Sequence, residues 1–283
     1  MSKLEKKAFS TEEYWRAYMN EGSPPDTIHK PWYTTKRLRP IFRILPSDPR
    51  CKFCYYPFEG MGGRLVRNLL GIEPSRMNPH LCNLCERFAA EHPGGAEIEL
   101  TMLFADVRGS TRIAERMKPA EFSQLINRFY RTTTTELFKA SGLVEKLIGD
   151  EVTAFFTPGF AGENHARVAI EAGRAILRAT GHGDPSGPWI PVGVGIHTGV
   201  AYVGTVSTEG GKTDIAVLGD TANTAARLTS VAGVGEIVLS EVTRAAAGLG
   251  AGGMEARQLQ LKGRTEPVDA WILRYSQEIV TAL

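Results

Sequence analysis

An alternation of strand and helix patterns between residues 98 and 231 constrains this chain more than any other feature of its sequence. Apolar residues at every second position indicate a strand, and apolar residues three or four apart indicate an amphipathic helix. In chain order the pattern predicts a strand at 98–104, a helix with Pro119 in its first turn, strands at 143–148 and 151–156, a helix at 164–180, a hairpin of strands at 192–196 and 200–206 around Thr198-Gly199, and a helix at 220–231. This is the order of the split βαβ, or ferredoxin-like, topology, so we predict an α+β fold.

Two aspartates occupy the ends of strands that this topology brings together. Asp106 follows the first strand, and Asp150 precedes the third. The split βαβ topology places the first strand beside the third and antiparallel to it, so these two ends should meet. Taken alone, Asp106 would be read as a helix N-cap and Asp150 as a turn residue. Together they favour a site for Mg²⁺, which binds one or two carboxylates and completes its shell with phosphate oxygens and water.

The segment that follows Asp106 has the features of a phosphate-binding turn. It reads Arg108-Gly109-Ser110-Thr111 and opens a helix. Free backbone N–H groups at a helix start attract phosphate, and a glycine allows close approach. A pair of divalent cations beside it would activate an attacking oxygen and neutralise a leaving phosphate. The sequence therefore predicts a site for metal ions and a triphosphate.

Four segments in this order resemble the catalytic domain of class III adenylate and guanylate cyclases. They are LFADVRGST from Leu103, VEKLIGDEVTAFF from Val144, VGVGIHTGVAYVG from Val192 and VLGDTANTAARL from Val217. The resemblance covers about residues 97–275. It implies an enzyme that closes a nucleoside triphosphate into a 3′,5′-cyclic nucleotide and releases pyrophosphate.

The resemblance also implies roles for individual residues. Asp106, Asp150 and the carbonyl of Val107 would hold two Mg²⁺ or Mn²⁺ ions. Arg227 would stabilise charge on the α-phosphate, for which a planar, permanently charged guanidinium is suited. Asn223, one helical turn earlier, would orient the ribose.

Further positions would bind the triphosphate. The turn residues Arg108, Gly109, Ser110 and Thr111 belong to this group. Lys262 would also contact the triphosphate, with Arg264 as the alternative.

The choice of base depends on two positions that disagree. Lys146 matches the family lysine that approaches N1 of adenine. Adenine-selective members pair it with Asp or Thr three residues before the glycine of the VLGD segment, where this chain has Ala216. Asp214 lies two residues earlier, on the same face of a strand, and would substitute, as would a backbone carbonyl. We predict ATP as the substrate because Lys146 is kept, with GTP or a pyrimidine triphosphate as alternatives.

The family places the metal aspartates on one subunit and the Asn/Arg pair on the other. This chain holds both sets, so a homodimer would suffice to form two sites. Two other interpretations stay open. A silent nucleotide-binding sensor is favoured by Ala216 alone, and a palm-type polymerase or diguanylate cyclase is favoured by the partial GGDEF echo in Gly149-Asp150-Glu151.

All four cysteines lie in two CxxC pairs, which are Cys51, Cys54, Cys82 and Cys85. In a reducing compartment this arrangement favours metal ligation over disulfides. Four thiolates suit tetrahedral Zn²⁺, which we favour. They also suit an iron–sulfur cluster, which the aromatic residues around the first pair would shield. Unligated thiols are the third alternative. A cluster would let redox state or NO regulate the enzyme.

We therefore divide the chain into three parts. Residues 1–50 form an N-terminal helix, starting near Ser10, and an irregular basic segment; residues 51–90 form the four-cysteine module; and residues 97–275 form the catalytic domain. A net charge of +2 favours no nucleic-acid partner. No apolar run approaches the ~18 residues of a membrane span, and the first residues lack the apolar region of a secretory signal. We expect a cytoplasmic protein.

Overall fold

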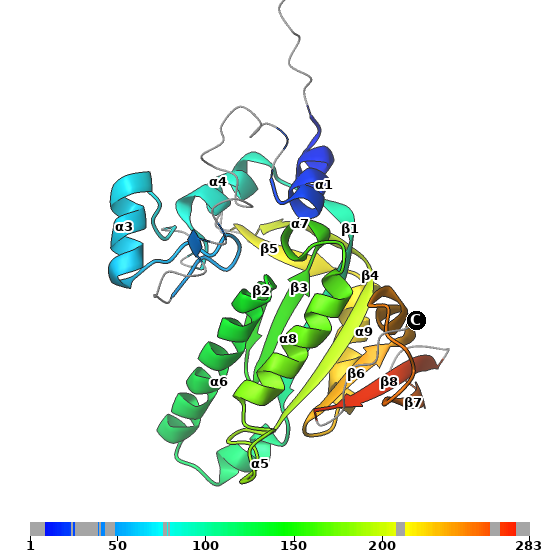
Figure 1. The fold of residues 1–283 in the computed structure, drawn as a ribbon. Helices are drawn as coiled ribbons and strands as arrows, with labels where there is room; N and C mark the ends of the chain where they lie inside the picture. The colour runs from blue at the N-terminus through cyan, green and yellow to red at the C-terminus, as the bar shows by residue number, and fades with distance from the viewer. Residues whose placement is uncertain are drawn as a thin grey trace, which may run out of the picture. The chain divides into compact units, whose positions relative to one another are not determined.

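The structure is a computed structural model that describes residues 9–23, 25, 39, 41–42, 49–75, 78, 80–207, 213–260 and 267–275 (Figure 1). The chain divides into two compact units. The first comprises Met1–Ile98 with Tyr202–Val217, and the second comprises Glu99–Ala201 with Leu218–Leu283. Three strands, β1 (Gly95–Val107), β4 (Val192–Ser207) and β5 (Thr213–Leu218), contribute residues to both units.

The described strands form one eight-stranded sheet with the order β2-β3-β1-β4-β6-β8-β7, in which β5 also pairs with β4. The strands are β1 (Gly95–Val107), β2 (Leu143–Ile148), β3 (Glu151–Phe156), β4 (Val192–Ser207), β5 (Thr213–Leu218), β6 (Glu236–Ser240), β7 (Glu255–Leu259) and β8 (Val268–Arg274). Strand β1 lies between β3 and β4 and pairs antiparallel with β3, in register from Thr101 opposite Phe156 to Asp106 opposite Glu151. The predicted split βαβ topology is confirmed.

The helices of the second unit cover both faces of its part of the sheet. They are α5 (Ser110–Glu115), α6 (Pro119–Lys139), α7 (Pro158–Ala161), α8 (His165–Ala179), α9 (Asp220–Val231) and α10 (Glu241–Ala246). Successive residues of β6 point to opposite faces. Ile237 and Leu239 join the core that contains α6 and α8, whereas Val238 joins a second core with Leu228 of α9. Helices α6 and α8, drawn in green, therefore lie on the face opposite to α9 (Figure 1).

The predicted hairpin around Thr198-Gly199 is wrong, because β4 runs through these residues without a break. Thr198 is buried, and its N–H donates to Oγ1 of Thr243 over 2.8 Å. Gly199 serves a close approach instead of a turn, since a Cβ there would lie 2.8 Å from Oγ1 of Thr221. The next strand in the chain is β5, which begins at Thr213 and pairs with β4.

The helices of the first unit include α1 (Thr11–Glu21), α3 (Gly60–Leu70) and α4 (Asn83–Glu91). Ser10 caps α1 with the predicted capping box, which it forms with Glu13. Trp15 is fully buried against Phe88 of α4 and donates its indole N–H to the carbonyl of His92 over 2.9 Å. None of the described helices is both long enough and apolar enough to cross a bilayer.

Candidate active site and cysteine cluster

The paired ends of β1 and β3 bring the two candidate metal aspartates to one edge of the second unit. Asp106 lies opposite Glu151, and the next residue, Val107, donates its N–H to the carbonyl of Asp150 over 3.1 Å. Gly149 adopts a φ of 61°, which a tight turn between β2 and β3 requires. Tyr130 of α6 donates its hydroxyl to the carbonyl of Gly149 over 2.7 Å and so holds this turn.

A third group, the guanidinium of Arg108, lies among these carboxylates. It forms an ion pair with Asp106. Burial lowers the pKa of Arg108, while the charges of Asp150 and Glu151 act in the opposite direction. Asp106 and Asp150 thus share the electrostatic field of one cation.

Arg108 also connects the end of β1 to the C-terminal end of α9. Its Nη1 donates to the carbonyls of Thr229 and Ser230, over 3.2 Å and 3.4 Å. A cationic side chain there satisfies carbonyls left open at a helix C-terminus. The guanidinium of Arg108 is therefore bonded both to Asp106 and to carbonyls of α9. The sequence had predicted that it contacts the triphosphate instead.

The edge carries more negative charge than Arg108 balances. Burial raises the pKa of Glu151, and the charge of Asp150 raises it further. Sequence analysis named Glu151 only as part of the GDE triplet after Asp150 and did not assign it to the site. An all-oxygen donor set with excess negative charge fits hard divalent cations. Asp106 and Asp150, with the backbone carbonyl of Val107, are therefore suited to hold Mg²⁺ or Mn²⁺.

The predicted phosphate turn follows directly. Gly109 has a φ of 69° and no atom lies within 4 Å of the place of a Cβ, so the position requires glycine for its backbone conformation and not for space. Helix α5 begins at Ser110, and its first intrahelical bond runs from the N–H of Ile113 to the carbonyl of Gly109 over 3.1 Å. The amides of Ser110 and Thr111 precede that bond.

Helix α9 presents the second set of candidate residues. Asn223 is exposed and Arg227 half-buried, while Ala225 and Leu228 face the core. Gly195 lets α9 pack closely on β4, since a Cβ there would lie 2.3 Å from the N of Thr229. In the described part of the chain, no hydrogen bond or ion pair joins Asn223 or Arg227 to Asp106 or Asp150.

The candidate base-binding residues lie on β2 and β5. The side chain of Lys146 is 45% exposed and pairs with Glu145 over 3.3 Å, at a bulge between Val144 and Lys146. Ala216 is buried on β5. The positions suggested for the triphosphate, Lys262 and Arg264, lie outside the described residues.

The Oδ1 atom of Asp214 already accepts hydrogen bonds from the protein. This atom accepts from Nζ of Lys52 over 2.6 Å, from Nδ2 of Asn78 over 3.3 Å and from the N–H of Ile215 over 2.8 Å. Three donors on one oxygen leave it poorly placed to accept from a base as well.

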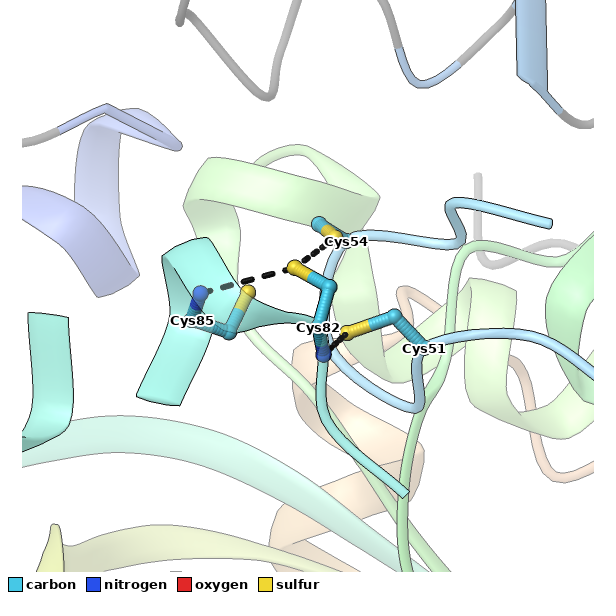
Figure 2. Close-up of side chains that lie close together, drawn as sticks. All are labelled: Cys51, Cys54, Cys82 and Cys85. Carbon is cyan, nitrogen blue, oxygen red and sulfur yellow. Dashed lines mark hydrogen bonds between the residues drawn. The ribbon is translucent and has the colours of Figure 1, made fainter. Parts of the chain in front are cut away.

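The four cysteines converge in the first unit, as Figure 2 shows. All four are buried, and their sulfurs lie within 4.8 Å of one another. The N–H of Cys82 donates to Sγ of Cys51 over 3.3 Å, and the N–H of Cys85 donates to Sγ of Cys82 over 3.4 Å. Such bonds stabilise sulfur that carries negative charge in metal centres.

The thiols of this cluster do not ionise alike. Burial raises the pKa of Cys51, but hydrogen bonds from Cys54, Cys82 and Cys85 outweigh burial and lower it. Burial raises the pKa of Cys54, and its hydrogen bond to Cys51 raises it further. The hydrogen bond with Cys51 also raises the pKa of Cys85. Four buried sulfurs in this arrangement fit a metal centre, which would compensate the charge of the thiolates.

Comparisons with known proteins point to one family. A sequence profile described as "Adenylate and Guanylate cyclase catalytic domain" matches residues 96–274. A curated relative from Anabaena cylindrica, named adenylate cyclase, is 32% identical over 152 residues, which are 51% of this chain and 30% of that protein. The chain spans about 30% of the length of the curated relatives it matches.

Two solved structures resemble the fold. The guanylyl cyclase Cya2 superposes with a TM-score of 0.56 at 27% identity, covering 63% of this chain and 93% of that one. The adenylyl cyclase CyaB from P. aeruginosa superposes with a TM-score of 0.55 at 26% identity, covering 67% of this chain and 97% of that one. The two neighbours differ in the base that their names give.

Proposed function

The chain belongs to the adenylate and guanylate cyclase catalytic-domain family, and from that premise we propose that it converts ATP to 3′,5′-cyclic AMP and pyrophosphate. The observation that carries the proposal is the meeting of Asp106 and Asp150 at paired strand ends, around one guanidinium. An edge rich in carboxylates, beside a glycine turn, suits divalent cations and a triphosphate.

The chemistry would be divided among these residues as follows. Divalent cations held by Asp106, Asp150 and the Val107 carbonyl would supply acidification of the ribose 3′-hydroxyl and neutralisation of the phosphates. The 3′-oxygen forms a bond to the α-phosphorus as the bond from that phosphorus to the bridging oxygen breaks, and the hydroxyl proton passes to water. Arg227 binds the α-phosphate as charge grows there, and Asn223 holds the ribose.

We propose further that the site is shared by two copies of the chain. Asn223 and Arg227 make no described bond to the aspartates of their own chain, yet both sets are present. Beside Lys146 on β2, Leu147 is 41% exposed and Ile148 is 59% exposed. Adjacent exposed apolar side chains mark surfaces that partners cover, and a two-fold dimer is the commonest arrangement.

GTP is the second candidate substrate. Ala216 offers no hydrogen-bonding side-chain group to the exocyclic amine of adenine, and Oδ1 of Asp214 already accepts from three donors. Lys146 favours ATP, because its exposed ammonium donates and N1 of adenine accepts.

Incubation of the purified chain with each of the four ribonucleoside triphosphates, with Mn²⁺ or Mg²⁺, tests this proposal. We expect mass spectrometry to identify cyclic AMP and pyrophosphate as the main products. A larger yield from GTP would overturn the assignment of the base. The absence of a cyclic product from all four would overturn the assignment of the enzyme.

The Lys146→Ala variant tests the contact with the base. We expect the KM for ATP to rise about tenfold, since a charge-assisted hydrogen bond is lost. Lys139→Ala is the matched control, because Lys139 is an exposed lysine of α6 whose side chain is 65% exposed. Equal KM values for the two variants would remove Lys146 from the site.

We propose that the four cysteines hold Zn²⁺, with an iron–sulfur cluster as the second candidate. The Cys82→Ser variant should lose the bound metal and unfold about 10 °C below the unaltered chain. Elemental analysis and thermal unfolding measure both effects, and visible absorbance distinguishes a cluster from zinc. An unaltered chain that carries no metal and resists heating equally in a chelator would contradict both candidates.

A further inference from the structure

Asp214 of β5 is tied to the cysteine module by two side chains of the same compact unit. Its Oδ1 accepts from Nζ of Lys52 over 2.6 Å and from Nδ2 of Asn78 over 3.3 Å. The side chain of Lys52 is only 12% exposed, and Asn78 is buried. The side chain of Asp214 is 47% exposed, so the constraint comes from the two donors, which are less mobile than the lysine of an ordinary surface pair.

Both donors belong to the loops that carry the metal-binding sulfurs. Lys52 follows Cys51, and its N–H donates to the carbonyl of His80 over 3.0 Å. Asn78 accepts at Oδ1 from the N–H of His80 over 3.2 Å, which fixes the orientation of its amide. Two residues after His80, the N–H of Cys82 donates to Sγ of Cys51. The positions of Lys52 and Asn78 therefore depend on the geometry of the sulfur cluster.

The acceptor lies at the start of a strand that leads to candidate site residues. Ile215, Ala216 and Val217 follow Asp214 and are buried. Strand β5 ends at Leu218, and α9 begins at Asp220 after the single residue Gly219. A strand of this kind is stiff, so a shift at Asp214 moves Ala216 with it.

We propose that Asp214 is a positioning residue for nucleotide recognition, through which the loaded cysteine cluster sets the placement of β5. This inference rests on the proposed function, because it takes β5 as the strand that faces the base. Metal holds the two cysteine loops in place, the loops hold Lys52 and Asn78, and these hold Asp214. Loss of the metal loosens the start of β5 at Asp214, while the strand stays paired with β4, and so weakens nucleotide binding.

Kinetics of the full chain with its metal test the proposal. Lys52→Gln and Asp214→Asn should each raise the KM for ATP about fivefold, with kcat much less affected and metal content unchanged. The double variant should be no worse than either single one, because both remove one interaction. Lys52→Arg keeps the charge and should restore a KM near that of the unaltered chain.

Lys139→Gln is the matched control, since Lys139 pairs with Glu136 over the same 2.6 Å within α6, and neither residue belongs to the cysteine module. It should leave the KM unchanged. Fully additive effects in the double variant, or a KM that none of these changes alters, would overturn the proposal.

Hydrogen exchange supplies a readout that does not depend on turnover. Removal of the metal by a chelator should speed exchange at the amides of residues 214–218. In Lys52→Gln the same amides should exchange fast with the metal still bound, and the chelator should add little. Exchange rates at these amides that change neither on removal of the metal nor in Lys52→Gln would refute the coupling. Normal coupling in a chain without cyclase activity would instead refute the proposed function.

Discussion

Replacing Asp106 or Asp150 by asparagine is expected to lower the rate of cyclic nucleotide formation about a thousandfold. The positions of the two aspartates adjoin because β1 and β3 pair to their ends, with Asp106 opposite Glu151. An amide keeps the shape of the side chain but removes the charge that holds a divalent cation. Initial rates at saturating ATP and Mn²⁺ measure the effect.

Asp269→Asn is the control for this experiment. Asp269 lies on β8 of the same sheet and accepts from Gln258 over 3.3 Å, far along the strand order from β1. It should retain full activity. Substantial turnover in either Asp106→Asn or Asp150→Asn would show that the metal site lies elsewhere.

Mixing two inactive variants is expected to restore activity. Arg227→Ala should lower kcat by a factor of about 100 to 1,000, as expected for loss of a preorganised charge at the transition state. When it is mixed with Asp106→Asn, mixed dimers contain one site with both the intact aspartates and the intact arginine. Random pairing gives half of the dimers as mixed, so about a quarter of the unaltered activity should return.

This recovery requires exchange of subunits, which differently tagged copies can demonstrate by co-purification. An unrestored rate in a sample that contains mixed dimers would contradict a site shared between chains. High activity of Arg227→Ala alone would remove the arginine from the mechanism.

Period-two patterning was sufficient to predict the part of the fold that positions the aspartates. The strands at 143–148 and 151–156 lie where the alternation predicted them, and β1 lies beside β3 as the topology requires. The two-residue turn at Gly149-Asp150 needs a residue with positive φ, which made it visible in the sequence. The turn residues and the strand order both placed Asp150 beside the end of β1, so the pairing of the two aspartate positions could be predicted.

The prediction of a hairpin at Thr198-Gly199 failed because tertiary packing, and not a turn, requires the glycine. Gly199 was read as a turn residue, whereas it admits Thr221 of α9 against β4. Gly195 has a similar role beside Thr229. A sequence shows that a glycine is present, but only the packing partner distinguishes a turn from a close contact.

Long-range partners explain the rest of what was missed at the site. Arg108 was predicted to face a phosphate, but its guanidinium contacts Asp106 and carbonyls more than 120 positions away. Asp214 was considered as a partner for the base, but its Oδ1 accepts from Lys52, 162 positions earlier. No local pattern encodes such pairs, because neither partner needs a particular neighbour in sequence.

The most direct test of the account is a crystal structure with Mn²⁺ and an ATP analogue that cannot be cyclised. We predict anomalous density for two ions, each about 2.1 Å from carboxylate oxygens of both Asp106 and Asp150, with the triphosphate on the other side. Bound nucleotide with manganese at another place, or with these two carboxylates free of metal, would contradict the central claim.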